Sequence, residues 1–599
     1  MNNNIKIALY LFAGIISLIV YSYLSSLVFN FLTKIPLEYA SPLSIWEDLS
    51  KPHTFENLQS KLFVSFSIPA LLGLGAAALI LGAPETNQFG DSKWATGNDI
   101  RKANLFKKDG LILGKFKGKY LISDTPTHAM LVAPTRSGKG VGIIIPTLLA
   151  WKGSLICLDV KNENYKKTAG FRAAHGQKTF MWSPLDKEGR SHRYNPLDAV
   201  SSNPYQKISD LQIIAKILIP DPPKSDPIWA SEARALFIGL ALYVIDNDEM
   251  ASTIGAINRL LGTEQDLAEI CRHIVTSHAE LSSTIKKSLM NFANKAAKER
   301  SGVKSSVNQA INLWDNPVID AATSASDFTI EDLRKEKSSI YVGVLTGQIS
   351  TLSPLLRIFF EQVITGLSME EPDESEPHQV LLMLDEFHML GKMDVMTNAF
   401  TLLAGYACRV VAVVQGLKFL DDTYGRDKRD GILSCCAHQI FFAANDLETA
   451  RYVSESCGEK TIQTTSSSKR HSMAYEAPTK NTSFRGRPLI TKEKVKQLPQ
   501  NEQIILVEAA RPIRCNKIEY FKDKNLKQRE IPPPEVPFLK IKDQIIPHFD
   551  IPDPSLIKAD KDRTDPNQTN LDLTKTTDKN PNMSDQLLDS PKENETNTA

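Results

Sequence analysis

Hydrophobic positions near the N-terminus form two long runs without charged residues. These runs cover residues 7–32 and 62–81. Each reaches the roughly 20 residues that a helix needs to cross the hydrocarbon of a bilayer. The first run exceeds the roughly 7–15 residues of a signal-peptide core, and it lacks a clean small-residue cleavage site. In the second, Gly73, Gly75 and Ala76 suit close helix packing in lipid. The pattern predicts a two-helix membrane anchor within residues 1–88.

Beyond the anchor the hydrophobic runs are short, and polar residues follow them. Continuous apolar runs of this length are typical of parallel strands that are covered on both faces. The predicted strands cover residues 130–133, 154–160, 339–344, 380–384, 409–415, 439–444 and 502–507. Residues 111–114 and 119–122 predict a hairpin that turns at Gly118. These runs together predict an α/β fold.

The pattern changes to helical spacing between residues 204 and 314. Apolar residues recur there every three to four positions, which is typical of amphipathic helices. The clearest helices are predicted at residues 208–218, 229–245, 251–261 and 264–274. We expect Trp229, Phe237 and Trp314 to lie in the core of this block. The sequence therefore predicts an all-helical insertion between two halves of the α/β sheet.

Two later segments have the composition of irregular chain. Residues 461–485 are rich in Ser, Thr and Lys and predict a mobile loop. A Pro-rich linker is predicted from Ile531 to Pro534. Beyond Asp550 the chain is polar, acidic-leaning and free of aromatic residues, so it cannot bury enough apolar area to offset the entropy of ordering. We therefore expect a disordered tail.

Charge and cysteine content narrow the functional classes. The formal net charge of +1 gives no overall basic signature for nucleic acid, so any such contact must be local. The seven cysteines contain no C-x-x-C pair, which argues against a zinc site or a disulfide framework. Lys and Arg are frequent just after the second apolar run, between Lys93 and Lys119. That bias places both termini in the cytoplasm.

The segment from Thr127 to Ala150 has the layout of a phosphate-binding loop. An apolar strand leads into a loop of small residues, and Lys139 then opens an apolar helix. Backbone N–H groups in such a loop surround a polyphosphate, and the lysine reaches its outer phosphates. The expected nucleotide contacts are Pro134, Thr135, Arg136, Ser137, Gly138, Lys139, Gly140 and Val141, which we call the phosphate loop. Ala133 and Gly140 depart from the G-x-x-x-x-G-K-[ST] pattern, and a Gly/Ser turn with a solvated lysine is the alternative.

Acidic and amide side chains follow three of the predicted strands. Asp385 and Glu386 end the apolar run at 380–384, and Gln415 ends the run at 409–414. A first carboxylate there can hold Mg²⁺ and a second can polarise the attacking water, while an amide can sense the γ-phosphate. Asp159 occupies a similar strand end. Strands often end in acids, so ordinary turn residues are the alternative reading for each.

Taken together, the motifs resemble those of one known family. They are APTRSGKGVG (133–142), LDVKNE (158–163), YNPLD (194–198), LDEFHMLG (384–391), AGYACRVVAVVQ (404–415), NDLETARYVSESCGE (445–459) and RGRPLI (485–490). With the preceding anchor, this set is similar to that of the type IV secretion coupling protein family, the VirD-four/TraG group. The likeness covers residues 90–520 and the anchor.

The resemblance implies a fold and a cellular role. It implies a RecA-like P-loop nucleotide-binding domain at 89–203 and 331–530, an all-α insertion at 204–330, an anchor at 1–88 and a linker with tail at 531–599. It also implies a homo-hexamer, a multi-pass protein of the bacterial inner membrane whose catalytic body is cytoplasmic. The implied partners are secretion-channel subunits and, as cargo, effector proteins or a relaxase–DNA complex.

These observations combine into one mechanistic hypothesis. ATP and Mg²⁺ bind at the phosphate loop, where Lys139 contacts the β- and γ-phosphates. Asp385 holds the metal, with Ser137 as a further candidate ligand; Glu386 activates water and Gln415 reports the γ-phosphate. The candidates for an arginine acting in trans are Arg409, Arg451 and Arg487. The alternatives are a membrane scaffold that binds nucleotide without turnover, and a DNA-segregation-type translocase.

Overall fold

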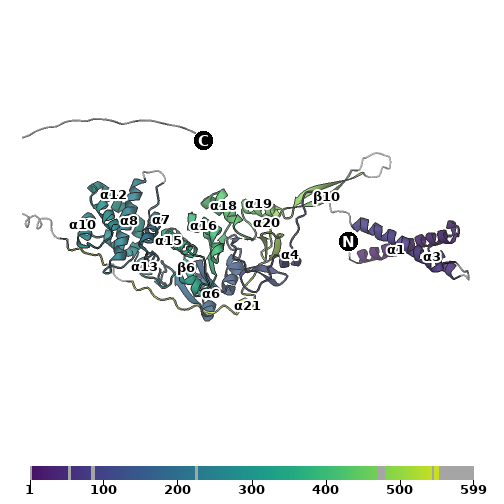
Figure 1. The fold of residues 1–599 in the computed structure, drawn as a ribbon, viewed down its shortest axis with the longest axis horizontal. Helices are drawn as coiled ribbons and strands as arrows, with labels where there is room; N and C mark the ends of the chain where they lie inside the picture. The colour runs from purple at the N-terminus through teal and green to yellow at the C-terminus, as the bar shows by residue number, and fades with distance from the viewer. Residues whose placement is uncertain are drawn as a thin grey trace, which may run out of the picture. The chain divides into compact units, whose positions relative to one another are not determined.

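The computed structural model describes residues 3–50, 56–81, 88–222, 227–468, 479–541 and 545–551. Two compact units make up the chain. Unit 1 contains residues 1–150 and 414–520, and unit 2 contains residues 151–413 and 521–599. Figure 1 follows the chain through these elements by colour. Neither unit is one continuous stretch of sequence.

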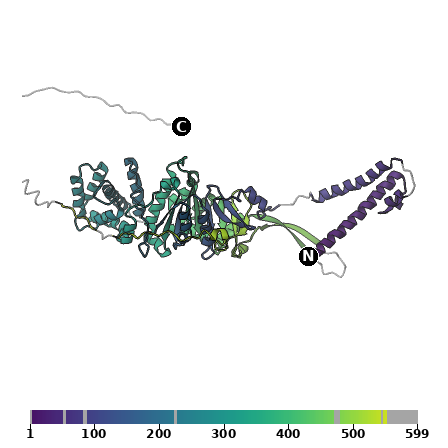
Figure 2. The ribbon, with the colours of Figure 1, turned by 90° about the horizontal axis from the view of Figure 1, so that it is seen from below.

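Two long helices open unit 1. They are α1 (Asn3–Thr33) and α3 (Leu58–Leu81), and the short α2 (Ser44–Leu49) lies between them. Figure 2 shows α1 and α3 as a hairpin. The Tyr21 hydroxyl donates to the carbonyl oxygen of Phe66 at 3.0 Å. The segment Gly14–Thr33 is apolar and long enough to cross a membrane, and Leu58–Leu74 is a shorter apolar segment.

The sheet of unit 1 contains the strand that leads into the phosphate loop. Its strand order is β2-β1-β13-β12-β9-β3. The strands are β1 (Leu111–Phe116), β2 (Lys119–Ser123), β3 (Ala129–Val132), β9 (His438–Phe441), β12 (Glu502–Val507) and β13 (Ile513–Asn516). β3 and β9 are parallel, and the other pairs are antiparallel. Gly118 has φ +84° in the β1–β2 turn, which confirms the predicted hairpin.

Unit 1 also contains several short helices. They are α4 (Gly97–Lys102), α5 (Ile145–Ala150), α17 (Leu417–Tyr424), α18 (Arg426–Ser434), α19 (Leu447–Ser456) and α20 (Lys492–Lys496). The Asp446 side chain accepts the backbone N–H of Thr449 at 2.8 Å and so caps α19. Such capping satisfies N–H groups that a helix start leaves without partners.

Unit 2 contains a parallel arrangement of buried strands. Their order is β8-β7-β4-β6-β5. The bounds are β4 (Ser154–Val160), β5 (Lys178–Trp182), β6 (Ser338–Val344), β7 (Val380–Leu384) and β8 (Cys408–Val414). Each neighbouring pair in this order is parallel: β8 with β7, β7 with β4, β4 with β6, and β6 with β5. β4, β6, β7 and β8 are buried along their whole length, as their continuous apolar sequence predicts.

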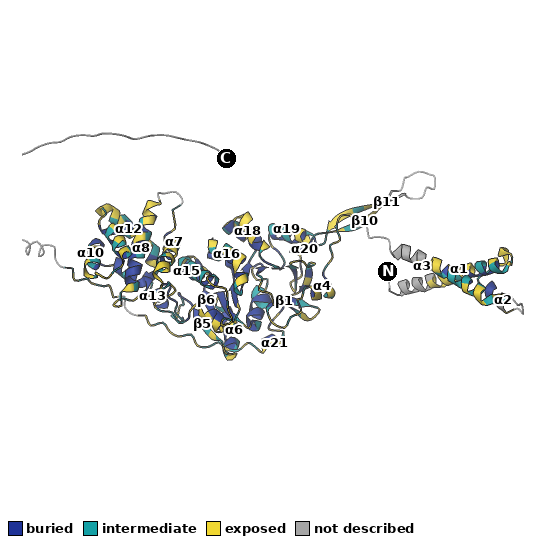
Figure 3. Ribbon diagram, viewed as in Figure 1, coloured by how far each residue is buried: buried dark blue, intermediate teal, exposed yellow. Residues whose placement is uncertain are grey.

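Every regular element that the structure describes between Pro204 and Lys335 is helical. They are α7 (Pro204–Leu218), α8 (Ile228–Asp246), α9 (Ile254–Leu261), α10 (Leu267–Ser277), α11 (Ser283–Ala293), α12 (Ala297–Ile311), α13 (Pro317–Ala322) and α14 (Asp332–Lys335). Unit 2 also contains α6 (Glu163–Ala174), α15 (Ile349–Ser368), α16 (Asp394–Leu402) and α21 (Lys524–Lys527). Figure 3 shows α8 largely buried, which fits a core helix despite its apolar length.

One core prediction for the helical block is wrong. Phe237 and Trp314 are buried, but Trp229 is 45% exposed. Trp229 is the second residue of α8, in its first turn. Its ring meets α12 at Gly302, where an added Cβ would approach the ring to 3.2 Å. The tryptophan therefore covers a helix surface and is not enclosed.

In the polar segment predicted as a mobile loop, the described residues on either side of 469–478 form a two-stranded ribbon, and residues 469–478 lie outside the described part of the chain. β10 (Glu459–Ser468) pairs antiparallel with β11 (Thr479–Pro488) along ten residues each. At its base, the N–H of Thr461 donates to Gly90 and that of Ser92 to Glu459. Figures 1 and 2 both show this ribbon as a long arm. Sequence pattern missed it because a ribbon exposed on both faces needs no apolar alternation.

The start of the predicted linker is bound to unit 2. The Pro534 carbonyl accepts the Tyr165 hydroxyl at 2.9 Å, and Leu539 N–H donates to Gly189 at 2.8 Å. Further along, Gln265 and the backbone of Phe549 exchange two hydrogen bonds, at 2.7 and 2.9 Å. We call residues 521–541 and 545–551 the strap. The predicted disordered tail beyond them lies outside the described residues.

Candidate nucleotide site

The phosphate loop joins β3 to a helix that begins at Gly140. That helix opens with the π-helical turn η2 (Gly140–Ile144) and continues as α5. Arg136 and Gly138 adopt left-handed backbone conformations, with φ of +60° and +86°. Left-handed residues that alternate with right-handed ones turn successive N–H groups toward one concave side, where an anion is bound. The loop therefore has the backbone geometry that its sequence predicts.

Hydrogen bonds within the loop maintain its turn. The N–H of Ser137 donates to the Pro134 carbonyl at 3.2 Å, and the Ser137 hydroxyl donates to the same oxygen at 2.5 Å. Gly142 N–H donates to the Gly138 carbonyl at 2.7 Å, which starts the helix. Lys139 precedes η2 and is half-exposed.

Gln415 lies beside the phosphate loop. It follows β8, and its side-chain oxygen accepts the Thr135 hydroxyl at 3.0 Å. The adjacent strand-end contact is between the N–H of Ala133 and the carbonyl of Val414, at 2.9 Å. The predicted neighbourhood of Gln415 and the loop is thus present within unit 1. Its role toward a γ-phosphate stays a prediction.

The two carboxylates of the LDEF motif follow β7 in unit 2. Asp385 and Glu386 are each only 9% exposed. Glu386 has φ +54° and ψ +44°, a left-handed conformation that is uncommon for a residue with a Cβ. Such backbone strain concentrates at functional sites, where it aims a side chain. Within the same unit His388 Nδ1 lies 3.8 Å from the Glu386 carboxylate.

A third carboxylate, Asp159, lies at the end of the neighbouring strand β4. It is fully buried, and its oxygens accept the N–H groups of Asn164 at 3.1 Å and Tyr165 at 2.8 Å. These donors belong to the first turn of α6, so Asp159 caps that helix. Burial is the main cause that raises the pKa of Asp159 to about 7, with a smaller contribution from the nearby charge of Asp385, while the hydrogen bonds from Tyr165 and Asn164 act to lower it. The capping contacts favour the structural reading of this residue.

The three candidate arginines occupy different environments. Arg409 is 1% exposed on β8, so it cannot reach another subunit from this position. Arg451 lies on α19, 3.8 Å from Glu448 and 3.5 Å from Glu455. Arg487 is exposed on β11, opposite Lys460. Among the three, Arg487 is the one that an incoming ligand could reach without breaking an ion pair.

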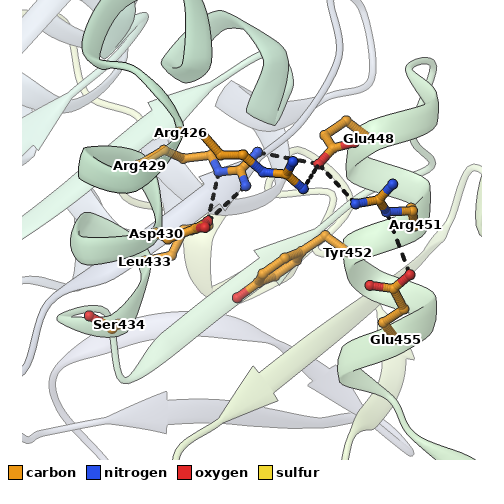
Figure 4. Close-up of a pocket in the computed structure, with 9 residues that line it drawn as sticks. All are labelled: Arg426, Arg429, Asp430, Leu433, Ser434, Glu448, Arg451, Tyr452 and Glu455. Atoms are coloured by element: carbon orange, nitrogen blue, oxygen red, sulfur yellow. Dashed lines mark hydrogen bonds and ion pairs between the residues drawn. The ribbon is translucent and has the colours of Figure 1, made fainter.

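The Arg451 ion pairs belong to a larger charged cluster (Figure 4). Its centre is Arg429, whose guanidinium contacts Asp421 at 3.0 Å, Asp430 at 2.8 Å and Glu448 at 3.6 Å. Arg426 also reaches Glu448, at 3.3 Å. Each guanidinium in the pocket thus faces at least one carboxylate, and we interpret the cluster as bracing between α18 and α19.

The two side chains predicted to bind metal, Ser137 in unit 1 and Asp385 in unit 2, carry oxygen donors of the kind that Mg²⁺ prefers. In the part of the chain that the structure describes, three or more His, Cys, Asp or Glu side chains do not gather into a metal-binding group. A Cβ at Gly140 would meet no atom within 4 Å, so the cradle is open there.

A strand, a loop with two left-handed residues, a lysine and an apolar helix define the class of P-loop nucleotide-binding proteins, here with a RecA-like α/β fold and helical insertion. Residues 91–539 match the family model described as Type IV secretory system Conjugative DNA transfer. The chain therefore belongs to the type IV secretion coupling protein family.

Curated relatives agree with this assignment. Protein VirD4 of Agrobacterium fabrum is 33% identical over 481 residues, which cover 78% of this chain and 70% of the relative. The conjugal transfer protein TraG of Escherichia coli is 28% identical over 530 residues, covering 78% and 83%.

Solved structures support the fold. The plasmid coupling protein TrwB, in complex with the ATP analogue ADPNP, matches with a TM-score of 0.53 at 16% identity, covering 76% of this chain and 97% of that one. A sulphate complex of TrwBdeltaN70 matches with a TM-score of 0.51 at 17% identity, covering 72% and 96%. The apolar N-terminal helices and the family together indicate association with the inner membrane.

Proposed function

We propose that this coupling protein hydrolyses ATP to drive substrate transfer into a type IV secretion channel. The observation that carries the proposal is the phosphate loop, in which Arg136 and Gly138 have the left-handed backbone conformation found in anion-binding loops, next to Lys139. Family membership supports the transfer role. TrwB, which shares the fold, was solved with an ATP analogue.

The proposed division of labour follows the local geometry. Phosphate-loop residues 134–141 hold the phosphates and Lys139 neutralises their charge. Asp385 and Ser137 hold Mg²⁺, which supplies positive charge at the transferring phosphoryl group. Glu386 orients and deprotonates water, and Gln415 responds to the γ-phosphate through its contact with Thr135. The proposal requires unit 2 to bring Asp385 and Glu386 to the nucleotide that unit 1 holds.

The cellular arrangement is part of the same proposal. The α1–α3 hairpin crosses the inner membrane, with both termini and the catalytic body in the cytoplasm. Six copies form a ring, and Arg487 of one subunit contacts the nucleotide of the next. Cargo, either effector proteins or a relaxase–DNA complex, is recruited by the helical block and passed to secretion-channel subunits.

Two variants of the full chain, reconstituted in lipid nanodiscs, test the catalytic part. Lys139→Ala should abolish ATP turnover because the lysine contacts the phosphates. Glu386→Gln should still bind ADPNP but hydrolyse ATP at least ~10²-fold more slowly, since only the water-activating carboxylate is lost.

Two outcomes would contradict this assignment. Turnover in Lys139→Ala equal to that of the wild type would remove the lysine from the mechanism. Loss of ADPNP binding in Glu386→Gln would indicate a structural role for the carboxylate. A wild-type chain that binds ADPNP but has no turnover, alone or with cargo, would favour the scaffold alternative, for which Gly140 in place of a hydroxyl residue is the supporting feature.

A further inference from the structure

A second lysine contacts the phosphate loop from the far end of the sequence. Lys517 directly follows β13, and its backbone N–H donates to Asn501 at 2.8 Å. Its side-chain ammonium donates to the backbone carbonyl of Ser137 at 3.1 Å. The same nitrogen lies 3.7 Å from the centroid of the Phe442 ring. All of these residues belong to unit 1.

The ammonium of Lys517 is held by neutral groups. Its contacts are a carbonyl oxygen and an aromatic face, and in the described part of the chain it forms no ion pair with a carboxylate. Burial lowers the pKa of Lys517 to about 8. An ammonium that loses part of its hydration without gaining a carboxylate is an unusual choice for a purely structural contact.

The carbonyl that Lys517 binds belongs to the peptide between Ser137 and Gly138. In a trans peptide the C=O and the N–H point to opposite sides. Fixing the Ser137 carbonyl toward Lys517 therefore directs the N–H of Gly138 away from Lys517. Gly138 has φ +86°, and a Cβ there would meet no atom within 4 Å, so the glycine serves the backbone conformation and not close packing.

The surroundings hold the lysine against the start of the helix. A Cβ built on Gly142 would lie 3.5 Å from the Ile518 carbonyl, 3.5 Å from the Phe442 ring and 3.9 Å from Cβ of Lys517. Ile518 and Phe442 are buried, so the segment after β13 is packed on η2. Lys517 thus has a fixed base from which its ammonium reaches the loop.

We propose that Lys517 is a positioning residue of the nucleotide site. It holds the Ser137–Gly138 peptide in the orientation that points the Gly138 N–H into the phosphate cradle. Without the ammonium, that peptide can turn its carbonyl toward the phosphates, which replaces a donor by a repelling acceptor. The charge of Lys517 also adds a second cation close to the polyphosphate. This inference rests on the proposed function, because it assumes that the loop binds a nucleotide.

The test measures ADPNP binding by the full chain in lipid nanodiscs, with Mg²⁺ present. Lys517→Met keeps an apolar stem against Phe442 but removes the donor and the charge. Its dissociation constant at pH 7 should rise about tenfold or more, the range expected for one charged hydrogen bond. Lys517→Arg keeps a cationic donor and should bind within about threefold of the wild type, a difference within ~1 kcal/mol.

Recovery of binding in Lys517→Arg but not in Lys517→Met separates positioning by a cationic donor from simple packing, because arginine keeps the charge and the N–H donors. The matched control is Lys522→Met, since Lys522 is exposed and also lies over a ring, 5.8 Å from the centroid of Phe521. That control should bind as the wild type does.

The outcomes distinguish this inference from the proposed function. If the wild type binds ADPNP, Lys139→Ala does not, and Lys517→Met binds within twofold of the wild type, the role of Lys517 is refuted while the site remains. Equal losses in Lys517→Met and Lys517→Arg, accompanied by a lower melting temperature, would also refute it in favour of packing. If the wild type fails to bind ADPNP, the proposed function itself is wrong.

Discussion

The Thr135 hydroxyl donates a hydrogen bond of 3.0 Å to the side-chain oxygen of Gln415, 280 residues later in the chain. Both residues belong to unit 1, and Gln415 is the residue that follows β8. The proposed response of Gln415 to the γ-phosphate depends on this contact.

Thr135→Val tests this connection. The variant keeps the shape of threonine but lets the Gln415 amide turn. We expect the ATP turnover number to fall about fivefold, the equivalent of one net hydrogen bond of ~1 kcal/mol, with little change in KM. Thr135→Ser keeps a hydroxyl and serves as the control. A raised KM with an unchanged turnover number would instead place the hydroxyl on the nucleotide itself.

Gly140→Ser tests the departure from the usual P-loop pattern. The position has room, because an added Cβ would meet no atom within 4 Å. A serine there restores the hydroxyl that normally contacts Mg²⁺, so half-maximal ATPase activity should need less Mg²⁺. Gly140→Ala is the control, because replacing glycine by alanine alone stabilises a helix by ~1 kcal/mol and adds no hydroxyl. Identical Mg²⁺ dependence in the two variants would show that the hydroxyl finds no metal.

Asp159→Asn tests the buried helix cap. The pKa of Asp159 is raised to about 7, above the unfolded value of 3.8. The folded protein then binds more protons than the unfolded chain between these values, so this group makes stability fall as pH rises from about 4 to 7. The difference in melting temperature, wild type minus Asp159→Asn, should therefore decrease from pH 5 to pH 7.5. A difference that grows with pH would contradict the raised pKa.

Gly170→Ala tests the attachment of the strap. Gly170 lies in α6, and a Cβ there would collide with the backbone carbonyls of Ile531 and Pro532. We expect faster proteolysis within residues 521–551. We also expect the free energy of unfolding to fall by about 1–3 kcal/mol, a fall that the better helix propensity of alanine partly offsets. Gly405→Ala is the control, because a Cβ there meets nothing within 4 Å. Unchanged cleavage would mean that the strap shifts without detaching.

The sequence predicted the elements that bury apolar side chains. Continuous apolar runs located β4, β6, β7 and β8, and three-to-four spacing located α7 to α10. The phosphate loop was found because its residues are contiguous. Gln415 and Asp385 were proposed because strand ends collect ligand-binding side chains in α/β proteins, and their roles stay predictions.

The sequence analysis did not predict features that have no apolar pattern. The β10–β11 ribbon exposes polar residues on both faces. The strap is held by hydrogen bonds to its backbone, and a proline-rich sequence gives no sign of them. Lys517 carries no motif, and the antiparallel pairing of β13 with β12 and β1 places it beside the loop. The left-handed Glu386 backbone could not be foreseen either, because this conformation is normally a glycine property.

The order of β3 and β9 in the chain affects how the protein is made. β3 precedes the phosphate loop, but its parallel partner in unit 1, β9, begins only at His438. A ribosome adds about 5–20 residues per second, so the loop waits on the order of tens of seconds for its sheet. By then the N-terminal helices have left the ribosome. The phosphate loop can therefore take up its folded position on the sheet of unit 1 only late in the synthesis of the chain.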